Sequence, residues 1–163
     1  MLKKIKADSL PASIGTLYPP PHHTHSKSRI KRALGNAFGL DQFGVNQTVL
    51  PPGTWSALPH WHTTEDELVY VLSGTATLVS GDHSEDMGPG DCVGFKAGEK
   101  IGHCIQNNSD ADVVILEIGS RNPQEKAYFP GRDMMADFSA ETLFRKLDGS
   151  SMGPLKRRGP DDD

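Results

Sequence analysis

Short apolar runs separated by glycine and proline turns dominate residues 29–119 of this 163-residue chain. The runs are rich in Val, Ile, Leu and Phe and cover residues 29–34, 42–50, 67–72, 76–80, 92–95, 103–106 and 113–119. Turn signals stand between them, as in Pro51-Pro52-Gly53 and Gly88-Pro89-Gly90. Many short strands at such spacing, with no amphipathic helix among them, indicate an antiparallel β-sandwich or barrel. We therefore expect an all-β fold.

Three histidines and one glutamate within two glycine-bounded segments predict a metal site. The four residues are His60, His62, Glu67 and His103. Alternate side chains of a strand share a face, so His60 and His62 are expected to point the same way. Imidazole and carboxylate ligands suit one divalent transition metal, such as Mn, Fe, Co, Ni or Zn, whereas calcium prefers oxygen ligands alone.

The alternative interpretation is that His60 and His62 are half-buried histidines on a polar face. A His-x-His pair is a weak signal by itself, and residues 23–25 contain a second one in a proline-rich segment. The glycine frame, the carboxylate and the later histidine do not easily arise together by chance. Their combination favours a metal site, and four protein ligands leave coordination positions open for a substrate.

At these residues the chain resembles the cupin superfamily. The first cupin motif reads G-x5-H-x-H-x3,4-E-x6-G, and residues 53–74 match it with one additional residue before His60. The second motif reads G-x5-P-x-G-x2-H-x3-N, and its places are filled by Gly90, Gly98, His103 and Asn107. Lys96 replaces the proline, and four residues rather than two separate Gly98 from His103. We therefore expect a longer turn before the last ligand.

The resemblance covers about residues 40–120 and implies a double-stranded β-helix, the jelly-roll-like barrel of the cupins. Within the superfamily, the small single-barrel proteins (monocupins) described as sugar-phosphate isomerases look most similar. The similarity to them lies in residues 34–40, 60–62 and 66–72.

The chain divides into four expected segments. They are an extended N-terminal arm over residues 1–28, the barrel over residues 29–120, a C-terminal extension packing on the barrel over residues 121–155, and a disordered tail over residues 156–163. The proline run 19–21 favours a polyproline-like path for the arm. The histidines at 22, 23 and 25 are interpreted as a surface cluster. Asp148-Gly149 indicates a hairpin turn, while residues 139–147 are also compatible with a short helix.

The composition and net charge of the chain argue against nucleic acid and membrane as binding partners. A net charge of −4 argues against a nucleic-acid surface, and no run approaches the ~20 apolar residues of a membrane span. The N-terminus lacks the apolar segment of a signal peptide, which predicts a cytoplasmic location. Cys92 and Cys104 are expected to be free thiols there, although a bond between them stays open. Cys104 should point away from the face of His103.

Three classes of function fit a metal site in such a barrel. The first is an isomerase or epimerase acting on a small hydroxy-carbonyl metabolite, such as a sugar or sugar phosphate; the resemblance places it first. The second is an iron-dependent dioxygenase with an apolar mouth to which Trp55 and Trp61 could contribute, although Trp61 is rather expected to pack outside the barrel. The third is a non-catalytic barrel that binds a small molecule.

No general base stands out, because Glu65, Asp66 and Lys96 flank the site in sequence without having to face it. The polar residues expected first at a substrate are Arg32, Asn46 and Lys100. Inward-facing Val69, Val71 and Ile105 should fill the barrel, and Asn107 should close a turn. Outward apolar residues need cover, which predicts a homodimer; they are Leu68, Tyr70 and Leu72.

Overall fold

The computed structural model describes residues 4–140 and 143–162, and this part of the chain forms strands and three short 3-10 helices. The helices are η1 (Ala7–Ser9), η2 (Thr24–Ser26) and η3 (Asn36–Phe38). The strands are β1 (Ser13–Ile14), β2 (Ile30–Ala33), β3 (Phe43–Leu50), β4 (Trp61–His62), β5 (Glu67–Ser73), β6 (Ala76–Ser80), β7 (His83–Met87), β8 (Cys92–Phe95), β9 (His103–Gln106), β10 (Val113–Ser120), β11 (Lys126–Tyr128), β12 (Met135–Asp137) and β13 (Phe144–Arg145). The predicted all-β fold is confirmed.

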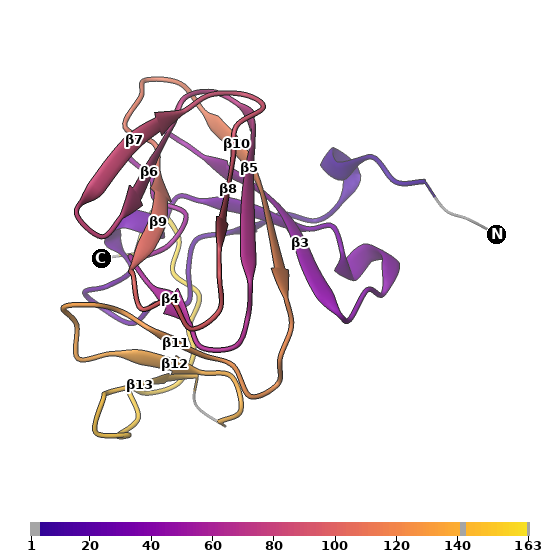
Figure 1. Cartoon of the computed structure of the whole chain (residues 1–163). Coiled ribbons are helices and arrows are strands. Elements are labelled where there is room, and N and C mark those ends of the chain that lie inside the picture. Colours follow the sequence, from indigo (N-terminus) through magenta and orange to yellow (C-terminus); the bar gives the residue numbers. More distant parts are fainter. Residues whose placement is uncertain (1–3, 141–142, 163) are drawn as a thin grey trace.

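The strands form three sheets whose pairings are all antiparallel. A six-stranded sheet has the order β1-β2-β3-β10-β5-β8, and a three-stranded sheet has the order β7-β6-β9. The remaining sheet, β13-β12-β11-β4, lies at the lower end of the molecule in Figure 1. Neighbours such as β3 and β10 are far apart in sequence, as expected for a barrel that winds back on itself.

The larger hydrophobic core is shared by the six-stranded and the three-stranded sheet. Its buried members are Leu50, Val69, Val71, Ala76, Leu78, Met87, Ile105, Val113 and Ile115. Val69, Val71 and Ile105 are at most 2% exposed, which confirms that they fill the barrel. On β5 these inward residues alternate with exposed ones such as Leu68 and Tyr70, as in any strand with one buried face.

A second hydrophobic core joins the N-terminal arm to the C-terminal strands. Its buried members are Tyr18, Leu58, Ala127, Phe129, Met134, Ala136 and Phe144. The Tyr18 ring meets Phe129 edge to face with centroids 5.6 Å apart, and its hydroxyl accepts a hydrogen bond from the Leu58 amide at 3.3 Å. The arm is therefore fixed on the barrel next to β4, which carries part of the predicted site.

A segment of the N-terminal arm pairs with a segment near the C-terminus. Ser13 and Ile14 form β1 and extend the six-stranded sheet by pairing with β2. Thr16 and Arg158 exchange backbone hydrogen bonds of 2.9 and 2.8 Å. The prediction of a disordered tail over residues 156–163 did not include this contact. The boundaries of the four segments stay a prediction.

The region around Asp148-Gly149 forms a hairpin. The Lys146 amide donates to the Ser150 carbonyl at 2.8 Å, and Gly149 adopts a φ of +87° that favours glycine. The alternative helix over residues 139–147 lies partly outside the described residues, and β13 occupies part of that stretch. No helix in the described ranges is long and apolar enough to cross a bilayer.

Candidate metal centre

The backbone brings the distant His103 next to His60. His60 immediately precedes β4, and His103 begins β9. The two residues exchange backbone hydrogen bonds of 3.2 Å and 2.9 Å, which form an isolated antiparallel bridge. Glu67 begins β5, which lies between β10 and β8 in the six-stranded sheet. Ligands from the two motifs therefore meet because β-bridges connect the segments that carry them.

The turn before His103 is where the sequence departs from the cupin motif. Gly98 has a φ of +82°, a conformation that other residues rarely adopt, and its amide donates to the His62 carbonyl at 2.8 Å. This bond fastens the turn to β4. The longer connection from Gly98 to His103 is thus accommodated without moving His103 away from the other three residues.

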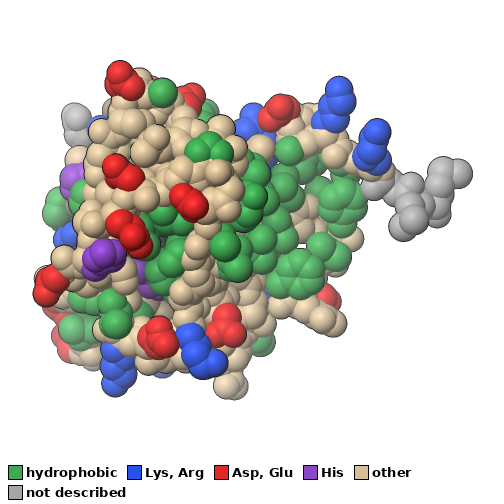
Figure 2. All heavy atoms as spheres, turned by 45° about the horizontal axis from the view of Figure 1, so that its top comes forward, with side chains coloured by type: hydrophobic (Ala, Val, Ile, Leu, Met, Phe, Trp, Pro, Cys, Tyr) green, Lys and Arg blue, Asp and Glu red, His purple; other side chains and the backbone are tan. Residues whose placement is uncertain are grey.

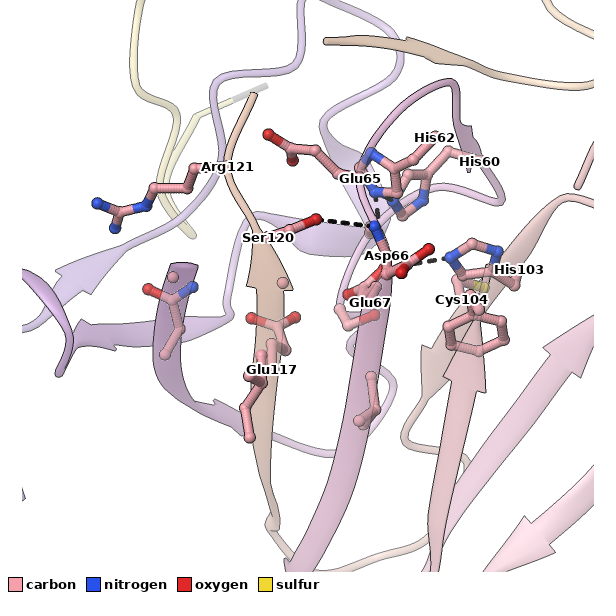
Figure 3. Close-up of a pocket in the computed structure, with 18 of the residues that line it drawn as sticks. His60, His62, Glu65, Asp66, Glu67, His103, Cys104, Glu117, Ser120 and Arg121 are labelled. Carbon is pink, nitrogen blue, oxygen red and sulfur yellow. Dashed lines mark hydrogen bonds and ion pairs between the residues drawn. The ribbon is translucent and has the colours of Figure 1, made fainter. Parts of the chain in front are cut away.

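The four side chains converge on one point. Their potential ligand atoms all lie within 4.8 Å of one another. His60 Nε2 lies 3.1 Å from His62 Nε2, and Glu67 Oε2 lies 3.2 Å from His103 Nε2 and 3.6 Å from His62 Nε2 (Figure 3). Ligands about 2.1 Å from one ion, in neighbouring octahedral positions, are about 3.0 Å apart. The donor set and its spacing fit a single transition-metal ion.

Hydrogen bonds outside the cluster assign the histidine tautomers. The Nδ1 atoms of His60 and His103 face the carbonyls of Leu58 and Ile101 at 2.8 and 3.3 Å. The Nδ1 atom of His62 faces a carboxylate oxygen at 3.2 Å. Each Nδ1 therefore carries the proton in the neutral ring, which leaves an Nε2 lone pair on all three histidines. Three lone pairs and a carboxylate facing one another repel, and a bound cation removes this repulsion.

Burial and mutual charge set the protonation of the cluster. Burial lowers the pKa of His60 to about 4, so its ring is neutral at pH 7. Burial also opposes charge on His62, but the carboxylates of Glu67 and Glu125 outweigh it and raise the His62 pKa. Burial disfavours the Glu67 anion, yet the rings of His103 and His62, which donate to Glu67 when their Nε2 atoms are protonated in the absence of a cation, hold the pKa of Glu67 well below its usual range. Glu67 is therefore an anionic ligand at neutral pH.

Glu125, which the sequence analysis did not identify, orients His62. Its carboxylate is fully buried and accepts the His62 Nδ1–H, and it also accepts backbone amides from Thr63 at 2.9 Å and Thr64 at 2.8 Å. Burial alone would raise the pKa of Glu125, but the bonds from Thr64 and Thr63 lower it. Carboxylates commonly fix a ligating histidine in this way. The residue lies just before β11, far from both motifs, so no motif could reveal it.

A cavity of about 690 Å³ opens beside the cluster, and all four residues line it. Of the residues predicted to contact a substrate, Asn46 lines this cavity, whereas Arg32 and Lys100 are not among its lining residues. The ammonium of Lys100 instead lies 5.8 Å from the centre of the Trp61 ring. Charged side chains that the sequence analysis did not single out for substrate contact also line the cavity: Arg29, Lys31, Glu117 and Arg121.

Two of the three residues considered as a base, Glu65 and Asp66, line the cavity, while Lys96 does not. Glu65 accepts the Asn122 amide at 2.6 Å, and burial raises the pKa of its carboxyl group. Asp66 accepts the Ala97 amide at 2.8 Å. Both carboxylates are therefore engaged by backbone donors at the rim of the cavity.

The two tryptophans that were considered for an apolar mouth stack on other rings. Trp55 stacks on His25 with ring centroids 3.9 Å apart, and Trp61 stacks on Tyr128 at 4.9 Å. Neither tryptophan is among the lining residues of the cavity. Phe95 does line it, and its ring stacks on His103 at 3.6 Å. This contact holds one ligand ring in place.

Asn107 closes a turn, as predicted. Its side-chain amide donates to the carbonyls of Leu50 and Ala111 at 2.7 and 2.8 Å. Cys92 is exposed and Cys104 is buried, and both are free thiols. Asn107 therefore supports the barrel rather than the cluster of ligands, whereas Cys104 is among the residues that line the cavity.

Comparisons with known proteins agree with the geometry. The Cupin domain family model matches residues 46–119. A sugar phosphate isomerase of the cupin superfamily from Silicibacter pomeroyi is 40% identical, with 93% of this chain and 97% of that chain covered and a TM-score of 0.84. A proposed sugar phosphate isomerase from Acidithiobacillus ferrooxidans is 30% identical, with coverages of 80% and 83% and a TM-score of 0.68.

A third structure shares the fold alone. The polyketide cyclase RemF from Streptomyces resistomycificus is 22% identical, with 74% of this chain and 80% of that chain covered and a TM-score of 0.59. A search among curated proteins gives no match.

Proposed function

Because this chain belongs to the cupin superfamily, we propose that His60, His62, Glu67 and His103 bind one divalent transition metal and that the protein is an isomerase or epimerase. The substrate would be a small hydroxy-carbonyl compound, such as a sugar or sugar phosphate. One observation carries the proposal: three Nε2 lone pairs and a carboxylate converge at the wall of a cavity. The names of the two relatives at 40% and 30% identity support the substrate class.

The cavity wall suits a polar, oxygen-rich substrate. A divalent metal held by the four residues supplies a Lewis acid for a carbonyl and the neighbouring hydroxyl. Asn46 offers an amide to further hydroxyl groups, and Arg29 and Arg121 line the same cavity, where the Arg121 guanidinium also donates to the Leu40 carbonyl and to the Asn36 side chain. Guanidinium groups pair well with anionic oxygens, including those of a phosphate. Buried Val69 and half-buried Phe95 complete the wall and would limit the access of water to the reacting carbons.

Metal analysis and proton exchange test this proposal together. Protein purified without added metal should contain about one transition-metal ion per chain, and the variant His60→Ala/His62→Ala should contain none, since two of the four ligands are lost. His83→Ala is the matched control, because this exposed histidine lies on β7 outside the cluster. With hydroxy-carbonyl sugars and sugar phosphates in deuterated water, the wild type should introduce deuterium next to the carbonyl, as seen by NMR.

The outcomes separate the three classes of function. Exchange that persists in metal-free His60→Ala/His62→Ala would remove the metal from the mechanism. Substrate-dependent oxygen consumption without exchange would instead support the dioxygenase. Tight binding of these compounds with neither exchange nor oxygen consumption would support a non-catalytic binding protein.

A further inference from the structure

A buried polar group faces the cavity on the strands next to Glu67. Glu117 lies on β10 and is 8% exposed. Its Oε2 accepts the Thr48 hydroxyl at 2.7 Å and lies 2.6 Å from the Lys31 ammonium. Glu117 and Lys31 line the same cavity as the predicted ligands. The interior of the barrel therefore contains a carboxylate–ammonium pair in addition to the metal cluster.

The sheet register fixes where this carboxylate lies. Glu117 is opposite Val69, and Glu67 is opposite Gly119 in the same pair of strands. Glu117 and Glu67 are thus diagonal neighbours on the inner face, and such residues are about 7–8 Å apart. Figure 3 shows Glu117 on β10, across the pocket from His103. Both residues line the same cavity, so a hydroxy-carbonyl unit bound at the cluster would share this cavity with Glu117.

One oxygen of Glu117 stays available. Both contacts described above involve Oε2, and Oε1 forms no hydrogen bond with the residues that the structure describes. Thr48 and Lys31 hold the group in place and stabilise its negative charge. An ionised carboxylate with a fixed position and a free oxygen can accept a proton from a carbon held in front of it.

We propose that Glu117 is the catalytic base of this site, with Lys31 as its charge partner; this rests on the proposed isomerase function. The C–H bond next to the carbonyl breaks, the proton passes to Glu117 Oε1, and the electron pair moves into the carbonyl to give an enediolate. The proton of the neighbouring hydroxyl passes to the former carbonyl oxygen, Glu117 returns its own proton to the former carbonyl carbon, and the new carbonyl forms at the carbon whose C–H bond broke. The step needs no oxidant or reductant, because one C–H bond breaks and one forms.

Glu65 is the competing candidate among the carboxylates of the cavity. Its Oε1 accepts the backbone amide of Asn122 at 2.6 Å and is therefore already engaged. Its carboxylate also lies within 4.8 Å of ligand atoms of His62 and Glu125. The two candidates can be separated by substitution.

The test compares Glu117→Gln with Glu65→Gln in metal-loaded protein, using the sugar phosphates that the wild type exchanges. Glu117→Gln should lose about 10²- to 10⁴-fold in exchange rate, which is the usual contribution of a general base. Its metal content and thermal midpoint, measured by mass spectrometry and calorimetry, should stay close to those of the wild type. Glu85→Gln on exposed β7 is the matched control.

A second variant and a labelled substrate test the role of Glu117 even if Glu117→Gln does not fold. Glu117→Asp keeps the charge but withdraws the carboxylate oxygen by about one C–C bond. This variant should fold, even if the Gln variant does not, and should catalyse deuterium exchange into the substrate more slowly than the wild type. Substrate deuterated next to the carbonyl should retain part of its label on the adjacent carbon of the product, because one carboxylate carries the proton between both positions.

The results distinguish this inference from the function on which it rests. Wild-type exchange that Glu117→Gln and Glu117→Asp both retain, or that Glu65→Gln alone abolishes, would overturn the role of Glu117 and leave the isomerase intact. No exchange by the wild type with any compound of the panel would overturn the proposed function, and the role of Glu117 with it.

Discussion

The carboxylate of Glu125 decides the orientation of a single ligand ring. It accepts the Nδ1–H of His62 and, at the same time, the backbone amides of Thr63 and Thr64. The bond to His62 keeps Nε2 free for a metal, and the bonds to the amides hold the loop between β4 and β5. One buried side chain thus links ligand geometry to backbone position.

Replacement of this carboxylate should weaken metal binding without removing a ligand. In Glu125→Gln the side-chain NH₂ faces donors and cannot accept from them, so His62 loses a fixed tautomer. We expect metal affinity to fall about 10- to 100-fold, as is typical for partners of ligating histidines. Competition with a chelator measures this, with Gln124→Glu as an exposed neighbouring control. Unchanged affinity in Glu125→Gln would contradict the positioning role.

The two cysteines should differ in reactivity. Cys92 is exposed on β8, whereas Cys104 is 2% exposed, and burial raises the pKa of the Cys104 thiol to about 11. The thiolate is the reactive form, so Cys104 stays protonated and unreactive as the pH rises until it approaches 11. Iodoacetamide at pH 8 should therefore add one label to the native protein and two in denaturant, as read by mass spectrometry.

Cys92→Ser identifies the labelled position, since this variant should add no label in the native state. Rapid labelling of Cys104 in the native variant would show that the interior is open to the reagent.

At the scale of elements, the strands with an apolar, alternating pattern were predictable. The ranges 92–95 and 103–106 agree with β8 and β9 as they stand. β7 was missed because its sequence, His-Ser-Glu-Asp-Met, is almost entirely polar and exposed. Pairing with β6 supplies its hydrogen bonds, and an edge strand can carry charges on both faces. Short strands such as β4 have too few residues to show any period.

In the candidate site, too, the residues that belong to a regular sequence pattern were predictable and the others were not. The four proposed ligands were evident because their spacing forms a motif, although no motif revealed Glu117 or Glu125. Glu117 is a single charged residue in the apolar run of β10, at an inward position, and that break in the pattern was a usable signal. Glu125 gave no such signal, since it lies in a polar loop and becomes important through tertiary contacts with Thr63 and Thr64.

At the scale of the whole molecule, part of one face of the six-stranded sheet is left uncovered by residues 4–140 and 143–162. Leu68, Tyr70 and Leu72 on β5 are 39%, 38% and 40% exposed, and Phe43 at the start of β3 is 42% exposed. Figure 2 shows hydrophobic side chains gathered on the side of the molecule that carries these strands. A contiguous apolar face of this kind is typical of a protein–protein interface. The homodimer expected from the sequence stays a prediction, and this face is the surface on which we place it.

Negative charges introduced on this face should prevent two copies of the chain from forming a dimer. We expect the wild type to have the mass of a dimer at micromolar concentration in light scattering, and Leu68→Glu/Leu72→Glu to have the mass of a monomer. Two carboxylates opposed to their copies across a two-fold interface repel, and they interrupt the apolar contact on both subunits. Leu147→Glu is the matched control, because Leu147 is 57% exposed in the C-terminal hairpin, away from the sheet. A monomeric wild type would contradict the dimer, and a dimeric double variant would place the interface on another surface.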